Sequence, residues 1–441
     1  MGWLPPGSQL TYAGGAFGFN VFHQTISLWL VYFYAPPPES GRETIVPIAI
    51  FGALLAAGEV IEAFDDPVIG HWSDRTRSRW GRRLPFILGG LPFLVGAFIL
   101  LFTPLPPGFW PAVAAFVVIQ LYHLAGTIVH QPYEAVLAEM ARSSEERVRV
   151  SSWKVAFGIL GAAVGLVGSG LLIGALGFPG MATVLGLLGG ASVAISAAGV
   201  RRLPQTPPHN RPLSLPESLR LTATNHQYLV FVVSEVLFFA GLDMLTALIP
   251  YLVTVVLGLP ESQTVWFTAV FIVVALVSLP AVNWLAARRG KAFTYRLAMT
   301  VLAVALPGLF FVGAIPGIDR MLQSVAYIGA LGVPMSVLFA LPNPMVANIV
   351  DYDETRTGLR REGAYYGVEE FVMSLGLALA TLVFSSVLGT FGFSAGEPLG
   401  IRLIGPVAGR AVAAGLLVFA RWYRLPEQIP SGRLTFGTES P

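Results

Sequence analysis

The sequence contains no cysteine and few charged residues, and both features limit the kinds of protein to which it can belong. Without cysteine, the chain forms neither disulfides nor thiolate metal sites. Asp, Glu, Lys and Arg make up only 12% of the 441 residues, whereas an average soluble protein carries about 25%. Together with 54% hydrophobic residues and a mean hydropathy of +0.69, this composition predicts an integral membrane protein.

Several functional signatures are also missing. The N-terminus MGWLPPGSQL lacks the basic segment and cleavage site of a signal peptide, so we expect the first span to be retained. The sequence has no P-loop pattern, which argues against ATP-driven transport. The net charge is only +2 and the basic residues are spread through short loops, so we expect no nucleic-acid partner. We further expect a monomer without a cofactor.

Long apolar runs make up most of the sequence. Twelve of them are near or above the roughly 20 residues that a helix needs to cross a bilayer. They cover residues 12–34, 45–72, 84–104, 109–140, 151–176, 181–200, 227–258, 264–286, 293–315, 321–350, 363–391 and 399–422. The predicted fold class is therefore an all-α membrane protein with twelve transmembrane helices. The even count places both chain ends on the same side.

The basic residues indicate which side that is. Of the 27 Lys and Arg residues, 23 lie in the even-numbered loops or the C-terminal end, and only Arg42, Arg320 and Arg402 lie in the opposite loops. Because loops rich in Lys and Arg stay in the cytoplasm, we expect both termini to be cytoplasmic, in a bacterial inner membrane. Arg410 lies inside the last span, where we expect an ion pair with another helix.

The spans divide into two sets of six. We expect six-helix bundles at residues 1–200 and 226–424, a cytoplasmic linker at 201–225 and a cytoplasmic tail at 425–441. The linker is rich in proline and polar residues, which favours a plain connector, with a short amphipathic surface helix at LPESLRL as the alternative.

The two halves repeat weakly in sequence. PYEAVLAE, which begins at Pro132, aligns with PMVANIVD, which begins at Pro344, at an offset of 212 residues. Pro67 and Pro280 repeat at an offset of 213. Such a repeat indicates two pseudo-symmetric bundles with a binding site between them, which is a transporter architecture.

Acidic residues interrupt the second span. Glu59, Glu62 and Asp66 share one helical face, and buried carboxylates of this kind indicate an ion or substrate path. Carboxylate and hydroxyl oxygens suit sodium, so Glu62, Asp66 and Thr127 are a candidate Na⁺ site. Clustered carboxylates also favour proton uptake. The coupling ion is therefore H⁺ or Na⁺.

A polar stripe also runs through the fourth span. His123, Thr127, His130 and Glu134 are spaced by 4, 3 and 4 residues and lie on one helical face. Histidine titrates near neutral pH, so this stripe is a candidate proton relay. Other polar residues that are candidates for a cavity wall are Asn20, His23, Glu235, Asp243, Glu369 and Glu370. For Tyr133 and Trp153 we expect interfacial anchoring.

Three motifs resemble one family. The loop in DDPVIGHWSDRTRSRWGRR, at residues 65–83, is similar to the loop between spans two and three of the major facilitator superfamily. Its particular form resembles the glycoside–pentoside–hexuronide:cation symporters, the melibiose permease family. PYEAVLAEMARSSEERVRV and NPMVANIVDYDETRTGLRREGAYYGVEEFV agree with this resemblance. In the superfamily the loop latches the two bundles in one state, which implicates Gly70, Asp74, Arg75, Gly81, Arg82 and Arg83.

The resemblance implies roles for individual residues. The family binds its cation with two acids one turn apart in span two, an Asn before the second acid and a Thr in span four. The matching residues are Glu62, Asp66, Asp65 and Thr127. Lys154 matches the basic residue early in span five. The family's sugar-binding acids fall on Gly14–Gly15 and on His130, and its span-eleven Lys falls on Ser374, so the galactoside contacts are not kept.

The predicted function is cation-coupled secondary transport of a small organic solute, a sugar or glycoside, by alternating access. The alternative substrate is a lysophospholipid or another amphiphile. His130 lies two residues before the proline of span four, and a histidine at this position resembles the related lysophospholipid symporters. A prenyltransferase-like membrane enzyme is the rival from a different class, because Asp65, Asp66 and Asp74 superficially resemble its paired aspartate motifs. The arginine-rich loop around them argues against it, so we expect no enzymatic activity.

Overall fold

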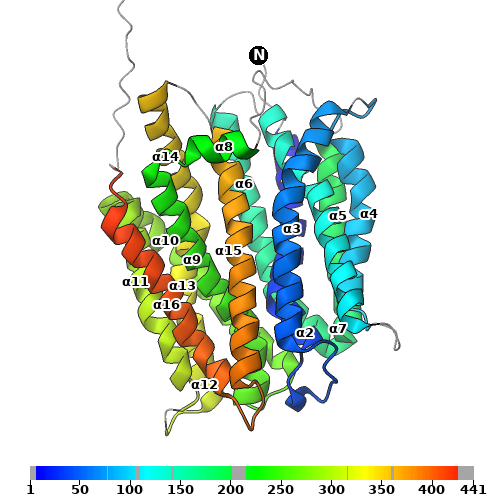
Figure 1. The fold of residues 1–441 in the computed structure, drawn as a ribbon, viewed down its shortest axis with the longest axis vertical. Helices are drawn as coiled ribbons and strands as arrows, with labels where there is room; N and C mark the ends of the chain where they lie inside the picture. Colours follow the sequence, from blue (N-terminus) through cyan, green and yellow to red (C-terminus); the bar gives the residue numbers. More distant parts are fainter. Residues whose placement is uncertain are drawn as a thin grey trace, which may run out of the picture.

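The computed structural model describes residues 6–76, 78–104, 110–140, 144–200, 215–314, 316–358 and 362–425 (Figure 1). These residues form long helices with short 3₁₀ and π segments, and no strand occurs among them. Nine helical segments of this part of the chain are long and apolar enough to cross a membrane. One of the nine, Arg149–Gly199, holds two spans, and α2 and α3 complete the predicted twelve.

The first bundle is built from the N-terminal half. Its helices are α1 (Pro6–Ala13), α2 (Gly15–Tyr34), α3 (Ile48–Arg75), α4 (Leu84–Leu101), α5 (Pro111–Met140), α6 (Ser144–Ala163) and α7 (Ser169–Val200). A π segment, Val164–Gly168, joins α6 to α7. The chain reverses inside α7 at Gly177, whose φ of 69° favours glycine. The reversal separates the predicted spans 151–176 and 181–200.

The second bundle follows the same plan. Its helices are α9 (His226–Tyr251), α10 (Thr264–Arg289), α11 (Lys291–Ala305), α12 (Arg320–Ala330), α13 (Gly332–Ala340), α14 (Pro342–Thr357), α15 (Glu362–Phe391) and α16 (Leu399–Trp422). Span ten, predicted as one helix, is broken into α12, α13 and α14. The break before α14 coincides with Pro342, which lies in the first turn of α14, a position that suits proline.

The linker contains a helix, which the sequence favoured less than a plain connector. α8 (Leu215–Thr222) packs on α15 at one end of the bundles (Figure 1). Leu219 packs against the apolar core and Thr222 is buried, which explains why LPESLRL folds. The plain connector is therefore the wrong prediction for this stretch, and the amphipathic alternative is correct. Residues 201–214 and 426–441 lie outside the described part of the chain.

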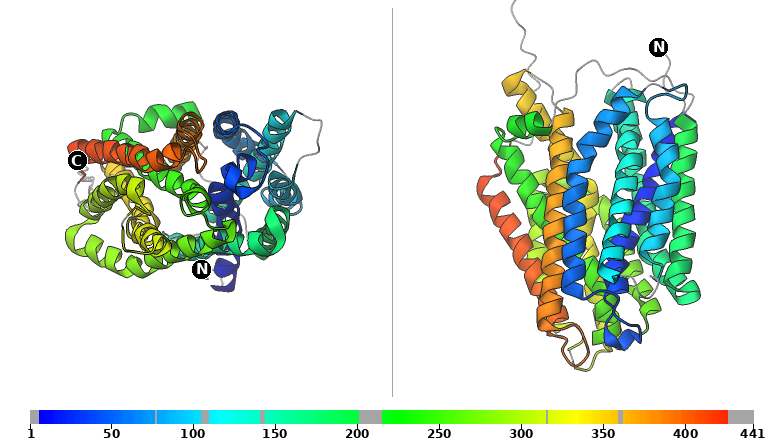
Figure 2. Two further views of the ribbon diagram at one scale, coloured as in Figure 1. Left: turned by 90° about the horizontal axis from the view of Figure 1, so that it is seen from below. Right: turned by 45° about the vertical axis from the view of Figure 1, so that its right-hand side comes forward.

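The two bundles meet along α3 and α15, which lie side by side, and along α2 and α9 (Figure 2). At the end opposite α8 they are also joined by polar contacts. Arg42 lies 2.8 Å from Glu261, and the Tyr251 hydroxyl donates to the Ala35 carbonyl over 2.8 Å. Tyr32 adds a hydrogen bond of 3.1 Å to Glu261. This end of the bundle interface is therefore closed.

Candidate functional site

A cavity of about 480 Å³ lies between the two bundles. Its walls come from α2, α3, α4 and α5 on one side and from α9 and α15 on the other. The polar residues that line it are Asn20, His23, Ser27, Glu59, Glu62, Tyr122, His123, Thr127, His130, Gln131, Asp243, Glu370, Ser374 and Thr381. Ten of the residues singled out from the sequence therefore converge on one space, although they come from five different helices: Asn20, His23, Glu59, Glu62, His123, Thr127, His130, Asp243, Glu370 and Ser374.

Glu62 on α3 contacts His123 on α5. The Oε2 atom of Glu62 lies 2.5 Å from Nδ1 of His123, and the two side chains are 30% and 13% exposed. Glu62 therefore has an imidazole partner. From the sequence we had placed His123 in a proton relay separate from the acids of span two. Carboxyl and imidazole groups are the side chains that most often take part in proton transfer, so this contact is a candidate coupling site.

The structure describes only part of the predicted sodium site, which comprises Glu62, Asp66 and Thr127. Thr127 is 2% exposed and lines the cavity, and its hydroxyl has no hydrogen-bond partner among the described residues. The side chain of Asp66 lies outside the described part of the chain, although the backbone of Asp66 belongs to α3. Asp65 does not line the cavity. Grouping Glu62, Asp66 and Thr127 around one ion therefore stays a prediction.

Glu59 faces a carboxylate of the opposite bundle. Its charged neighbours are Asp243 on α9 and Glu62, and its Oε2 atom is buried without a hydrogen-bond partner in the described structure. Ser27 on α2 donates to Oδ1 of Asp243 over 2.5 Å, which links the two bundles. Glu59 therefore belongs to the cavity wall, where two acids from different bundles approach each other.

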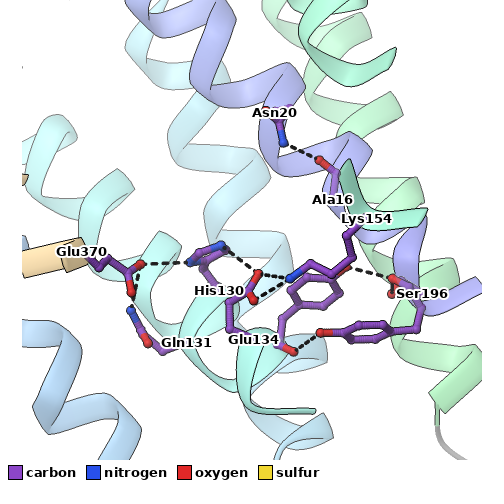
Figure 3. A network of polar contacts seen from close by, with 10 residues as sticks. Ala16, Asn20, His130, Gln131, Glu134, Lys154, Ser196 and Glu370 are labelled. Atoms are coloured by element: carbon purple, nitrogen blue, oxygen red, sulfur yellow. Dashed lines mark hydrogen bonds and ion pairs between the residues drawn. The ribbon is translucent and has the colours of Figure 1, made fainter. Parts of the chain in front are cut away.

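A second network crosses the bundle interface on α5 (Figure 3). Nε2 of His130 lies 3.5 Å from Glu134, and Nδ1 of the same ring lies 3.9 Å from Glu370 on α15. Gln131 donates to Glu370 over 3.4 Å. Lys154 on α6 donates to both oxygens of Glu134 over 2.5 and 2.7 Å. His130 thus stands between an acid of its own bundle and an acid of the other.

Lys154 and Tyr133 stand behind the cavity wall. The Lys154 ammonium lies 5.3 Å from the centroid of the Tyr133 ring. Tyr133 is buried, stacks on Tyr12 at 4.8 Å and donates to the Tyr12 carbonyl. The expectation that Tyr133 anchors the protein at the membrane interface is wrong, because its ring packs inside the first bundle. Trp153 is exposed, in keeping with the anchoring role expected of it.

Two other expectations fail on geometry. Glu235 does not line the cavity but is buried beside Glu369, within the second bundle. Arg410 is exposed on α16, and no salt bridge of this residue occurs among the described ones. Both errors concern rotation about the helix axis, which decides whether a residue faces the cavity, a neighbouring helix or the surroundings.

The basic loop is described in part. The backbone of Gly70 and Asp74 belongs to α3, and the Asp74 side chain lies outside the described part of the chain. Gly81 turns the chain with a φ of 86°. The buried Arg83 guanidinium donates to the Ser73 hydroxyl, which ties the loop to the end of α3. Arg75 is exposed and Arg82 is half-buried.

Ser27 and Gln131 were missed in the sequence. Ser27 follows His23 by 4 residues and Asn20 by 7, so the same helical-face argument that found the stripe in α5 also finds Ser27. Gln131 directly follows His130. Ser374 lies one turn after Glu370 and donates to the Glu370 carbonyl over 3.1 Å.

Comparisons with known proteins agree with this architecture. The model of a family described as MFS/sugar transport protein matches residues 11–415. An uncharacterised symporter of Synechocystis sp. is 27% identical, over 90% of this chain and 88% of its own length. The isoprimeverose transporter of Lactiplantibacillus pentosus is 23% identical, over 94% of this chain and 88% of its own length. A crystal structure of the nucleoside transporter NupG superposes with a TM-score of 0.65 over 95% of this chain, at 12% identity, which shows a common fold.

Proposed function

Because the chain belongs to the MFS/sugar transport protein family, we propose that it is a cation-coupled symporter that carries a sugar or glycoside through the central cavity. Family membership confirms the resemblance to the glycoside–pentoside–hexuronide:cation symporters and removes the prenyltransferase-like enzyme from consideration. The observation that carries the proposal is the cavity itself. It is bounded by both bundles, so movement of one bundle against the other changes its access, as alternating access requires.

The coupling ion is bound by the acids of α3. The contact between Glu62 and His123 favours a proton, because it joins a carboxyl group to an imidazole. Sodium held by Glu62, Asp66 and Thr127 is the alternative, and the unpartnered Thr127 hydroxyl supports it. Glu59 and Asp243 approach each other from opposite bundles, so a cation bound between them also stabilises the closed bundle interface.

A sugar is supported by the named relative, an isoprimeverose transporter, and by the hydroxyl, amide and carboxyl groups of the cavity wall. A second candidate, an amphiphilic solute, is supported by the rest of the lining. Much of that wall is apolar, including Phe19, Phe22, Ile26, Leu30, Leu55, Met244, Met373, Leu377 and Phe384. An acyl chain packs on such a surface and leaves a polar head among the acids.

We assign the end opposite α8 to the outside of a bacterial inner membrane, because the basic loops lie at the α8 end. The Arg42–Glu261 contact then closes the outer side of the bundle interface. In this orientation the structure corresponds to a state in which the outer entrance is shut. Transport requires that this contact break when the cavity opens outward.

The test is uptake by the purified protein in proteoliposomes. Isoprimeverose and other glycosides are compared with a lysophospholipid, under an imposed proton gradient or sodium gradient. We expect a glycoside to accumulate under one of the two gradients, and an ionophore for that ion to abolish the accumulation. Accumulation of the lysophospholipid alone would identify the amphiphile as the substrate. Equilibration without accumulation under either gradient would contradict coupling.

A further inference from the structure

A cluster of arginines lies outside the cavity, where α10 ends and α11 begins. Gly290 alone separates the two helices, and its φ of 90° favours glycine. Arg288 and Arg289 lie in the last turn of α10, and Arg296 lies in the second turn of α11. All three side chains are exposed. We call these three arginines the basic corner, and the function proposed above makes no use of them.

Exposed apolar faces of both helices lead to the basic corner. On α10, Val273, Val277, Trp284 and Arg288 are spaced by 4, 7 and 4 residues, so they share one helical face. On α11, a second exposed apolar face consists of Phe293, Leu297, Val301 and Val304. Because these helices cross a membrane, their exposed apolar side chains face lipid acyl chains. The basic corner therefore lies where a lipid-facing surface reaches the end of the spans.

Two aromatic rings support the arginine side chains. The Cζ atom of Arg288 lies 4.5 Å from the centroid of the Trp284 ring, and that of Arg289 lies 5.9 Å from the centroid of Phe293. Both distances are within the range of a cation–π interaction. Trp284 is 55% exposed, as is common for tryptophan at the membrane interface. A guanidinium group stacked on a ring keeps its N–H groups available in its own plane for another acceptor.

The basic corner has no acidic partner in the described part of the chain. Neither a salt bridge nor a side-chain hydrogen bond of Arg288, Arg289 or Arg296 occurs among the described residues. Lys291, between them in sequence, differs, because its Nζ atom donates to Oδ1 of Asn348 over 3.0 Å. A helix C-terminus and a cytoplasmic loop both favour positive charge, which explains the sign of the charge here. Neither requires guanidinium groups that lie against exposed rings and keep their donors unused.

We propose that the basic corner binds the headgroup of an anionic phospholipid. The forked N–H donors of arginine match the oxygens of a phosphate group, and basic sites beside transmembrane helices suit such headgroups. The acyl chains of the same lipid pack on the apolar faces of α10 and α11, which a free phosphate ion would leave uncovered. Phosphatidylglycerol brings a net negative charge to the arginines, whereas phosphatidylcholine brings a cation of its own. The ligand class is therefore an anionic lipid.

Thermal unfolding of the purified full-length protein in an uncharged detergent tests the proposal. A ligand that binds the native state raises the thermal midpoint by mass action. We expect phosphatidylglycerol to raise the midpoint of the wild type more than phosphatidylcholine with the same acyl chains. The variant Arg288→Gln/Arg289→Gln should lose most of this additional rise. The matched control, Arg220→Gln/Arg356→Gln, removes the same charge from exposed arginines of α8 and α14 and should keep the rise.

Three results would overturn the proposal. The first is an equal rise with phosphatidylglycerol in the wild type and in Arg288→Gln/Arg289→Gln. The second is an equal loss in the control variant, because net charge alone would then explain the effect. The third is an equal rise with glycerol phosphate in place of the lipid, which would assign the arginines to a free anion.

A second comparison keeps the proposal testable if the double variant does not fold. Arg296→Gln is then compared with the single control Arg356→Gln in the same assay. We expect Arg296→Gln to reduce the additional rise with phosphatidylglycerol and Arg356→Gln to leave it unchanged, and equal rises in both variants would contradict the site. These readouts need no transported solute, so they are independent of the transport proposal.

Discussion

The Oε2 atom of Glu62 lies 2.5 Å from Nδ1 of His123, so the acid stripe of α3 and the polar stripe of α5 form one site. Their side chains are only partly exposed and both line the cavity. A proton taken up at this contact changes the charge of the cavity wall. This relationship supports placing coupling at the wall of the substrate cavity, where the bound ion and the solute influence each other's affinity.

The Lys154–Glu134 pair should stabilise the first bundle. Among the described residues, Lys154→Met leaves Glu134 with the more distant His130 as its basic neighbour. We expect unfolding to become easier by about 1 kcal/mol, a modest value because the Glu134 side chain is 38% exposed. Thermal unfolding in detergent measures the change. Glu134→Gln added to Lys154→Met removes the unpaired charge and should recover part of the loss. A double variant less stable than Lys154→Met would argue against this account.

Breaking the outer contact should shift the protein towards an outward-facing state. Glu261→Gln removes the partner of Arg42 and weakens the acceptor of Tyr32. Since the chain has no cysteine, a single Ser374→Cys variant reports access to the cavity wall. We expect a membrane-impermeant maleimide to label this cysteine from outside several-fold faster in the Glu261→Gln background. The control is Glu43→Gln, an exposed acid in the same loop as Arg42. Equal labelling rates in all backgrounds would show that the contact does not control access.

The proposed orientation in the membrane rests on the distribution of basic residues. A cysteine at Thr224, which is exposed beside α8, should be labelled only from the cytoplasmic side. A cysteine at Thr44, which is exposed in the loop after α2, should be labelled only from outside. Intact cells and inside-out vesicles distinguish the two. Labelling of Thr224→Cys in intact cells would reverse the proposed orientation.

Much of this arrangement could be predicted from the sequence, because hydropathy and helical periodicity are local properties. The twelve spans and the polar faces of α3 and α5 needed only the residues within each helix. The resemblance to a symporter family added which acids are expected to bind the cation. The family match confirms the resemblance, and the roles of these acids stay a prediction.

Contacts between distant residues could not be predicted in this way. Asp243 meets Ser27 from 216 residues away, across two helices whose rotation the sequence leaves open. Arg410 was misplaced for the same reason, since a residue in mid-helix faces inward or outward according to the packing of the whole helix. The amphipathic pattern of α8 was visible, but whether so short a segment folds depends on the surface of α15 beneath it.

The central claim is that Glu62 couples transport to a cation gradient. The most direct measurement is uptake by proteoliposomes containing Glu62→Gln, with exchange of the same solute across the membrane measured in parallel. We predict that exchange continues while gradient-driven accumulation falls to the equilibrium level, because the variant retains the cavity but not the titrating carboxylate. Glu59→Gln should show the same loss, since Glu59 also lines the cavity, whereas Asp65→Asn should show less effect, since Asp65 does not. Wild-type accumulation in Glu62→Gln would contradict the account and move the coupling site away from α3.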